Sequence, residues 1–532
     1  MNPDDRNEPT EPTEPPPPRE MDRDPVLPPQ DVIDQVQGRV LDPSTALVVK
    51  GVRPRSTVYV GHRLTISKAV DIGQALDILR QVGEGLGWDV ELEPEDDVTR
   101  KLRFGLRRVS ISPRSREVAM APDGWTLLQQ ARAKYPLKEL NGVGLDHVIF
   151  PTPIESNPYH SSHPYHSSHP YHSSHPFSAP VATYGIPGSG GRQPVFYPGP
   201  PPKREDDDAK LTGRRPVVAI MDTGCGKHDW LRQDKVVFKD LKLDNDPIGY
   251  TVPITNPEEY PDQIGQLDGV IDPLAGHGTF IAGLVHQGCP DAKILSWRVV
   301  PSTGPIIESD WITALAQVAE LVHRYRNDPK TGQPIDVLSL SMGYYHETPY
   351  DELFDPTLYA ILEDLSKNGT LVVCSAGNDA TARPSFPAAF APWLPGKPGE
   401  KEGPVKGSTT CLPIVSVGAR NPANRSDALF SNAGRWVRAY AHGAALVSTI
   451  PPFQGGLQPP ARTKAFGRRR EAIDPDDFRG GFAVWSGTSF AAPLLAGRLA
   501  SIALGSIPKD ETAKAAVDRW WTALGTHLEI KP

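Results

Sequence analysis

The chain has 532 residues, 56 basic and 64 acidic side chains, a net charge of −8 at pH 7, and 58 prolines. This length exceeds what one hydrophobic core usually organises, and proline at about twice its ordinary share predicts long unpacked stretches. The charge balance argues against broad electrostatic binding to nucleic acid or to an anionic membrane. Four cysteines without a C-x-x-C pair argue against a disulfide scaffold and a structural zinc site.

The N-terminal sequence is rich in proline and in acidic residues. Ten prolines fall within residues 1–30, and this composition cannot repay the entropy of ordering, so residues 1–45 are predicted to be a disordered tail. The sequence lacks the basic start and apolar core of a secretory signal, and no apolar run approaches the roughly 18 residues of a membrane helix. We therefore expect a cytoplasmic protein without a membrane or nucleic-acid partner.

Residues 46–150 are predicted to form a small α+β domain. Residues 56–67 and 103–112 have the β-branched and apolar pattern of strands, whereas residues 71–87 and 124–135 carry apolar side chains at helical spacing. The segment is therefore expected to fold as a unit of its own ahead of the longer C-terminal part.

Residues 151–211 have the composition of a linker. They contain thirteen prolines and an acidic run, and the hexapeptide YHSSHP occurs three times between residues 159 and 176. Its histidines recur at every third residue, so a polyproline II helix would align them on one face with neighbouring rings roughly 9 Å apart. This spacing is too wide for two rings to bind one ion unless the chain bends. A solvated linker is therefore favoured, with metal binding and a pH-dependent contact as the alternatives.

Residues 212–532 alternate short apolar runs with amphipathic helical segments. The runs include PVVAIMDTG, AKILSWRVV, IDVLSLSMG, TLVVCSAGN and LPIVSVGAR, with helical segments such as WITALAQVAELVHRYR between them. This alternation predicts an α/β domain, in which a mostly parallel sheet has helices on both faces. Active groups in such sheets lie at the carboxyl ends of the strands, so polar residues that directly follow these runs are candidates for chemistry.

Three short motifs occupy such positions: DTG at residues 222–224, GHGT at residues 276–279 and GTS at residues 487–489. They bring a carboxylate, an imidazole and a hydroxyl to strand ends or helix starts. From there, side chains far apart in sequence can converge as an orienting group, a base and a nucleophile. Each motif alone is also an ordinary turn or helix cap. Their joint occurrence in this order favours catalysis.

Together with LSLSMG, SAGN, FPAAF, VSVGA, FSNAG and GTSFAAP, these motifs resemble, in chain order, the signatures of the subtilisin-like serine proteases. The resemblance extends over residues 215–500. It implies the subtilisin-like fold and a serine endopeptidase that hydrolyses peptide bonds through an acyl-enzyme. An α/β-hydrolase would need a G-x-S-x-G motif and the order Ser, Asp, His, whereas here Ala491 takes the fifth position and the order is Asp, His, Ser.

The resemblance assigns roles to four residues. Ser489 would be the nucleophile, and His277 would take its proton during attack and return it to the leaving amine. Asp222 would orient the imidazole, and Asn378 would donate a hydrogen bond to the oxyanion. By the same resemblance, two strand edges would pair with an extended polypeptide substrate. The residues of these edges are Ser341, Met342, Gly343, Ser375, Ala376 and Gly377.

Cofactors and regulation stay open at this point. No run has EF-hand spacing, so no cofactor is expected to be required, no metal site is assigned, and calcium enters only by family analogy. Residues 46–150 would be either a pro-segment that inhibits the enzyme intramolecularly or a retained sensor domain. The alternative function is a catalytically silent, protease-like module that binds peptides or signals.

Overall fold

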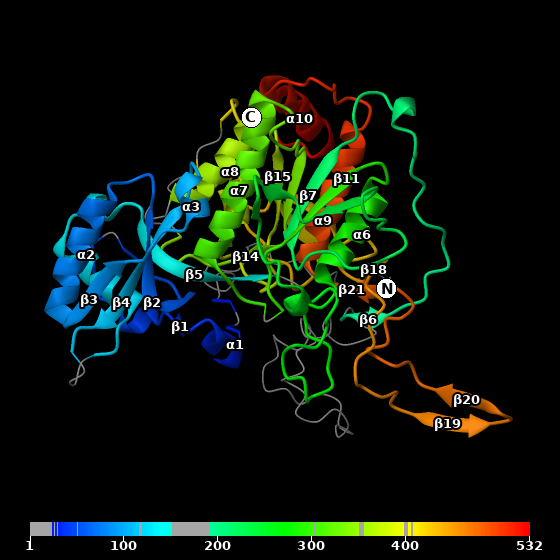
Figure 1. Ribbon diagram of the computed structural model, residues 1–532, viewed down its shortest axis with the longest axis horizontal. Coiled ribbons are helices and arrows are strands. Elements are labelled where there is room, and N and C mark those ends of the chain that lie inside the picture. The colour runs from blue at the N-terminus through cyan, green and yellow to red at the C-terminus, as the bar shows by residue number, and fades with distance from the viewer. Residues whose placement is uncertain are drawn as a thin grey trace, which may run out of the picture.

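The computed structural model describes residues 24–25, 27–28, 30–50, 52–115, 120–151, 191–302, 304–349, 356–397, 403–405 and 408–531. Figure 1 shows an N-terminal α+β domain, drawn in blue and cyan, beside a larger α/β domain, drawn from green to red. The YHSSHP repeats lie outside the described residues, so what the sequence predicts for them stays a prediction.

The described part of the larger domain contains a seven-stranded sheet in the order β17-β16-β15-β13-β7-β11-β8. All neighbouring strands in it are parallel, which confirms the predicted α/β class. Its central strands are buried on both faces, which explains why they read as continuous apolar runs. The strands are β7 (Val217–Asp222), β8 (Val237–Lys239), β11 (Lys293–Arg298), β13 (Val337–Leu340), β15 (Leu371–Ser375), β16 (Val415–Arg420) and β17 (Ala439–His442).

Helices cover both faces of this sheet. Alternate side chains of β7 point to opposite faces: Val218 and Ile220 belong to the core under α6 and α9, while Ala219 and Met221 belong to the core under α7 and α8. A further helix, α10, packs against the first of these cores through Trp520. The helices are α6 (His277–Gly288), α7 (Glu308–Asn327), α8 (Pro356–Lys367), α9 (Thr488–Ala503) and α10 (Ala513–His527).

The N-terminal domain is an antiparallel sheet covered by helices α2 and α4, as its predicted α+β class requires. The side chain of Asp71 caps the start of α2, and Gly87, with φ of +75°, ends it. The elements are α1 (Gln30–Gln35), β1 (Gly38–Val40), β2 (Val58–Ser67), α2 (Ile72–Leu86), β3 (Trp88–Leu92), α3 (Asp97–Lys101), β4 (Leu106–Pro113), α4 (Gly124–Lys134) and β5 (Val143–Pro151). The strands β3 and β5 were not predicted.

The N-terminal sheet continues into the larger domain through β5. This strand pairs antiparallel with β2 on one side and with β12 (Ile306–Ile307) and β14 (Met342–Gly343) of the larger domain on the other. In Figure 1 the cyan β5 runs out of the blue domain toward β14. The two domains are therefore joined by main-chain hydrogen bonds as well as by side chains.

Two predicted boundaries differ from the structure. The proposed tail to residue 45 already contains α1 and β1, because β1 pairs with β2 and Ile33 is buried. Residues 191–211, assigned to the linker, lie against the larger domain, where β6 (Gln193–Pro194) pairs with β21 (Phe482–Trp485). The guanidinium of Arg192 donates to the Ala275 carbonyl at 2.7 Å. Hydrogen bonds of this kind keep a proline-rich segment in place without a hydrophobic core of its own.

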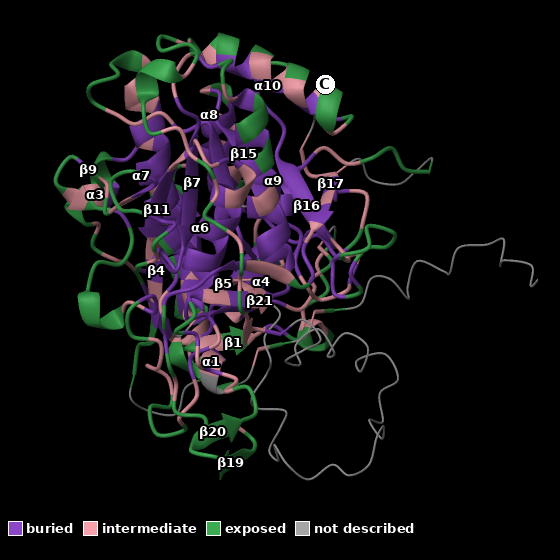
Figure 2. Ribbon diagram, turned by 90° about the vertical axis from the view of Figure 1, so that its right-hand side faces the viewer, coloured by how far each residue is buried: buried purple, intermediate pink, exposed green. Residues whose placement is uncertain are grey.

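Figure 2 shows that buried residues fill the parallel sheet and α6 and α9, whereas the hairpin of β19 (Arg462–Ala465) and β20 (Arg468–Glu471) is exposed. The hairpin projects away from the rest of the domain (Figure 1), and Phe466 between its two strands is fully exposed. Among the helices that the structure describes, none is both long enough and apolar enough to cross a membrane.

Candidate active site

Asp222 and His277 form a buried pair at the carboxyl edge of the sheet. Asp222 is the last residue of β7 and His277 is the first of α6, and neither is exposed to solvent. His277 Nδ1 lies 2.6 Å from Asp222 Oδ1, which also accepts the backbone N–H of Thr223 at 2.8 Å. A carboxylate that faces Nδ1 assigns the proton to that nitrogen and leaves the lone pair on Nε2.

The turn that delivers His277 depends on glycine. Gly276 has φ of +83°, and a Cβ at this position would lie 2.6 Å from Ile450 Cγ1. Only glycine fits this close approach in the left-handed conformation. The chain can therefore enter α6 directly behind the end of β7.

Aromatic side chains enclose the His277 ring. The ring centroids of Phe490 and Trp485 lie 5.2 and 5.7 Å from that of His277, and Phe280 packs against Phe490 at 4.6 Å. Among the described residues, His277 Nε2 is buried and has no hydrogen-bond partner. The imidazole thus presents an unpaired lone pair in a largely apolar environment.

Ser489 is the second residue of α9 and is buried. Its hydroxyl donates to the Ser341 carbonyl at 3.2 Å, and the Ser341 hydroxyl donates to the Ser489 carbonyl at 2.8 Å. The structure therefore brings Ser489 to Ser341 and not into a hydrogen bond with His277. Because Phe490, the next residue, contacts the His277 ring, the start of α9 lies beside the imidazole.

Asn378 is held against the residue that precedes Ser489. Its Oδ1 accepts hydrogen bonds from the backbone N–H and the hydroxyl of Thr488, at 2.9 and 2.8 Å. The backbone N–H of Gly377 donates to the same hydroxyl at 3.1 Å. The hydrogen bonds to its oxygen therefore fix the orientation of the Asn378 carboxamide at the N-terminus of the helix that carries Ser489.

The two predicted substrate edges follow neighbouring parallel strands, β13 and β15. On the first, Met342 pairs with Pro151 and Gly343 with Phe150, so β5 covers this edge. On the second, after Ser375, the Ala376 and Gly377 carbonyls accept hydrogen bonds from the side chain and backbone of Asn432, both at 2.9 Å. The second edge therefore has a protein neighbour of its own.

Sequence reasoning missed Glu258, whose carboxylate contacts the residues next to Asp222 and His277. It is 1% exposed and accepts hydrogen bonds from the hydroxyls of Thr223 and Thr279. It lies among several acidic residues in the long segment between β10 (Asp246–Pro247) and α6. No local pattern distinguishes it there from its neighbours.

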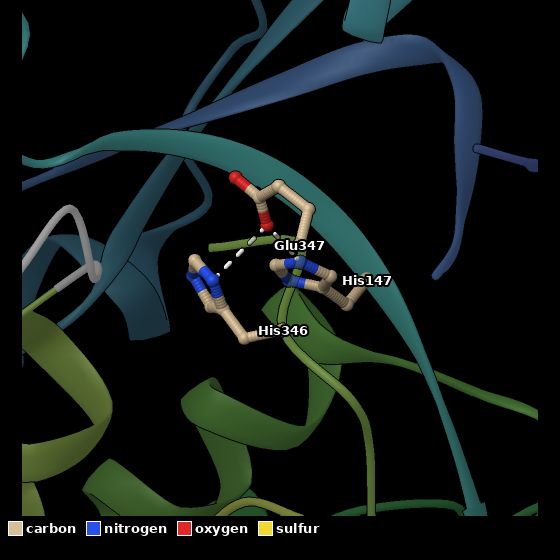
Figure 3. Close-up of side chains that lie close together, drawn as sticks. All are labelled: His147, His346 and Glu347. Carbon is tan, nitrogen blue, oxygen red and sulfur yellow. Dashed lines mark hydrogen bonds and ion pairs between the residues drawn. The ribbon is translucent and has the colours of Figure 1, made fainter. Parts of the chain in front are cut away.

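One group of potential metal ligands lies between the domains, within the described part of the chain: His147, His346 and Glu347, with donor atoms within 4.8 Å of one another (Figure 3). His147 Nδ1 lies 2.6 Å from Glu308 Oε2, and Nε2 lies 2.9 Å from Glu347 Oε2. His346 Nδ1 accepts the backbone N–H of Thr348 at 3.0 Å. Since these ring nitrogens already have protein partners, we assign no metal to the group.

Together with Arg132 and Glu308, these three residues form a buried network of charged and polar side chains, called here the interdomain cluster: Arg132, His147, Glu308, His346 and Glu347. Burial alone lowers the pKa of His147, but the two glutamates beside it outweigh burial and raise this pKa to about 10. Burial lowers the pKa of His346 to about 4. At neutral pH the cluster therefore contains a charged His147 and a neutral His346.

Comparison with known proteins extends the sequence resemblance. Residues 213–517, more than half of the chain, match the model of the Subtilase family. The chain is 26% identical over 306 residues to the "Major intracellular serine protease" of Bacillus subtilis (strain 168), covering 55% of this chain and 69% of that protein. It is 25% identical over 305 residues to the "Intracellular serine protease" of Paenibacillus polymyxa, covering 54% of this chain and 67% of that protein.

Solved structures with a similar chain include fervidolysin from Fervidobacterium pennivorans, a keratinolytic enzyme related to subtilisin. It is 15% identical, with a TM-score of 0.43, covering 87% of this chain and 58% of that one. The match to the family model over residues 213–517, which include the whole parallel sheet, identifies the family. This chain belongs to the subtilase family of serine peptidases.

Proposed function

We propose that the chain is an endopeptidase in which Ser489 is the nucleophile, His277 the general base and Asp222 its orienting group. The observation that supports this best is the 2.6 Å contact between His277 Nδ1 and Asp222 Oδ1, buried beside the start of α9. A nucleophile, a base and an orienting carboxylate are the set that acyl transfer needs.

The first step of the proposed reaction begins with a rotation of Ser489. Its hydroxyl turns from the Ser341 carbonyl to His277 Nε2 and gives up its proton there as the oxygen attacks the substrate carbonyl. Negative charge develops on the substrate oxygen. The Asn378 carboxamide and the N-terminal end of α9 stabilise this charge.

The second half of the reaction returns the proton. His277 donates it to the leaving amine as the peptide bond breaks, and the acyl group stays on Ser489. A water molecule then attacks the ester, giving its proton to His277, and the acid product leaves as Ser489 recovers its hydroxyl proton. Asp222 stabilises the imidazolium in each transition state.

We further propose that the N-terminal domain inhibits this site intramolecularly. An extended substrate would bind by adding a strand to the Met342–Gly343 edge, and β5 already pairs with that edge. Because β5 occupies the edge where substrate would bind, we favour a pro-segment over a sensor domain as the role of the N-terminal domain. A sensor domain would have no need to cover this edge.

Side-chain contacts between the two domains also hold the N-terminal domain in this position. His147 lies between Glu308 and Glu347 of the larger domain. The buried guanidinium of Arg383 donates to the Ser56 carbonyl at 2.6 Å. Paired buried charges of this kind are costly to separate, so the inhibited arrangement is expected to be tight.

The proposal is tested by hydrolysis of a denatured protein substrate with the full chain. Once it has processed itself between the domains, wild type should cleave the substrate, whereas Ser489→Ala should not. Ser501→Ala should behave as wild type because Ser501 is an exposed residue of the same helix. Intact mass measurement should show processing between the domains in the wild type and none in Ser489→Ala. Hydrolysis by Ser489→Ala would contradict the assignment. Wild type that stayed inactive after removal of the N-terminal domain would favour a silent peptide-binding module.

A further inference from the structure

Glu258 connects the two segments that carry Asp222 and His277. Its Oε1 accepts the hydroxyl proton of Thr223, which follows Asp222, and the backbone N–H of Gly278, which follows His277, at 3.1 Å. Its Oε2 accepts the hydroxyl of Thr279. One buried carboxylate therefore bridges the end of β7 and the first turn of α6.

The bridge provides a hydrogen-bond acceptor at the start of α6. The first N–H groups of a helix have no partner within it, and a side chain at the N-cap normally satisfies one of them. The N-cap of α6 is Gly276, which has no side chain and makes no capping hydrogen bond. The Gly278 N–H is shared between the Thr223 hydroxyl oxygen, at 2.8 Å, and Glu258 Oε1, at 3.1 Å. Glu258 therefore supplies an acceptor from outside the helix together with Thr223, and its negative charge also interacts favourably with the helix dipole.

The bridge also affects the hydrogen bonds of Asp222. The Thr223 hydroxyl has one proton and two acceptors within reach, Asp222 Oδ1 at 3.2 Å and Glu258 Oε1 at 2.5 Å. We assign the proton to the shorter contact, with Glu258. Asp222 Oδ1 therefore accepts from the backbone N–H of Thr223 and from His277. Without Glu258, the hydroxyl would be released to compete for the oxygen that orients the imidazole.

We infer that Glu258 is a positioning residue of the proposed triad, which fixes the His277 ring against Asp222 through Thr223 and the first turn of α6. This inference rests on the proposed function and assigns Glu258 no contact with substrate. Burial and the neighbouring Asp222 raise the pKa of Glu258 above its ordinary value, so an uncharged amide of the same shape is a fitting replacement.

The first test compares kcat, KM and the pH profile of variants produced as the full chain and assayed after release of the N-terminal domain, with active enzyme counted by a serine-directed phosphonate. Glu258→Ala should lower kcat about 10- to 100-fold with KM nearly unchanged, because a misplacement near 1 Å costs up to about 10². Its acidic limb of kcat/KM should move to lower pH, since a loosened Asp222 stabilises the imidazolium less. Glu258→Gln keeps the acceptor for Thr223 and Gly278 and should restore kcat to within about fivefold. Glu259→Gln, in the adjacent exposed residue, is the control.

Three outcomes would overturn the inference: Glu258→Ala with wild-type kcat and pH profile, Glu258→Gln as impaired as Glu258→Ala, or a fall in the number of active sites alone. If Glu258→Ala fails to fold, Glu258→Asp replaces it, because the shorter side chain cannot reach both segments and should give an intermediate kcat.

A second readout needs no turnover. In full-chain Ser489→Ala protein, the downfield proton resonance of His277 Nδ1–H should persist with Glu258→Gln and weaken with Glu258→Ala. An inactive wild type would count against the proposed function. An unchanged resonance of His277 in Glu258→Ala would instead count against the positioning role of Glu258.

Discussion

The interdomain cluster allows the inhibited arrangement to be perturbed at one residue, His147. His147→Gln removes a buried cation and leaves Glu308 and Glu347 facing each other across the former imidazole site. Breaking a buried pair typically costs about 3–5 kcal/mol. Glu347 keeps the guanidinium of Arg132 at 3.3 Å, so we expect the lower end of this range, about 3 kcal/mol, which is roughly a hundredfold weaker docking.

Amide hydrogen exchange in the uncleaved Ser489→Ala chain measures this change. The amides of β5 and β14 should exchange roughly a hundredfold faster in His147→Gln, while those of β7 in the parallel sheet should be unaffected. His62→Gln is the matched control, because His62 is half-buried on β2 and its charged neighbours, Arg63 and Glu93, belong to its own domain. Unchanged exchange of β5 in His147→Gln would refute the reasoning, since it would mean that the cluster does not hold the domains together.

Three further predictions concern pH, the oxyanion and the helix start. The pKa of His147 is raised from 6.5 to about 10, so docking of the two domains should be strongest below pH 6.5 and weaken as pH rises through 10. Amide exchange of β5, corrected for its intrinsic pH dependence, should therefore become faster over this range. A corrected exchange rate that did not change with pH would contradict this prediction. Asn378→Ala should lower kcat by about 10²–10³ with a small effect on KM in steady-state kinetics, and an unchanged kcat would remove it from the oxyanion site. Gly278→Ala places a Cβ 2.0 Å from the Gly224 carbonyl oxygen and should reduce thermal stability and activity, whereas Gly480→Ala meets no atom within 4 Å and should not; equal effects would contradict this packing.

The parallel sheet could be predicted because its strands are buried on both faces. The runs around β7 and β15 are continuously apolar and end in polar residues. Asp222 is the last residue of β7, and Asn378 follows β15, which ends at Ser375. The roles of these residues came from the family resemblance, since a turn and an active-site residue look the same in a short motif.

Contacts between segments distant in sequence could not be predicted. The strand β5 contains Asp146 and His147, which look like surface residues, and both are buried by partners on α7 and beyond. Glu258 reads as one acid among many until the fold brings it under α6. The ordered part of the proposed linker was missed for a similar reason, because Arg204 binds the Pro290 and Ala292 carbonyls far along the chain.

The most direct test of the account is covalent labelling with a serine-directed phosphonate, followed by mapping of the adduct by tandem mass spectrometry. After release of the N-terminal domain, one phosphonyl group should be found on Ser489, and no adduct should form in Ser489→Ala. Labelling of the substituted protein to the same extent, or an adduct on a different serine, would contradict the proposed triad.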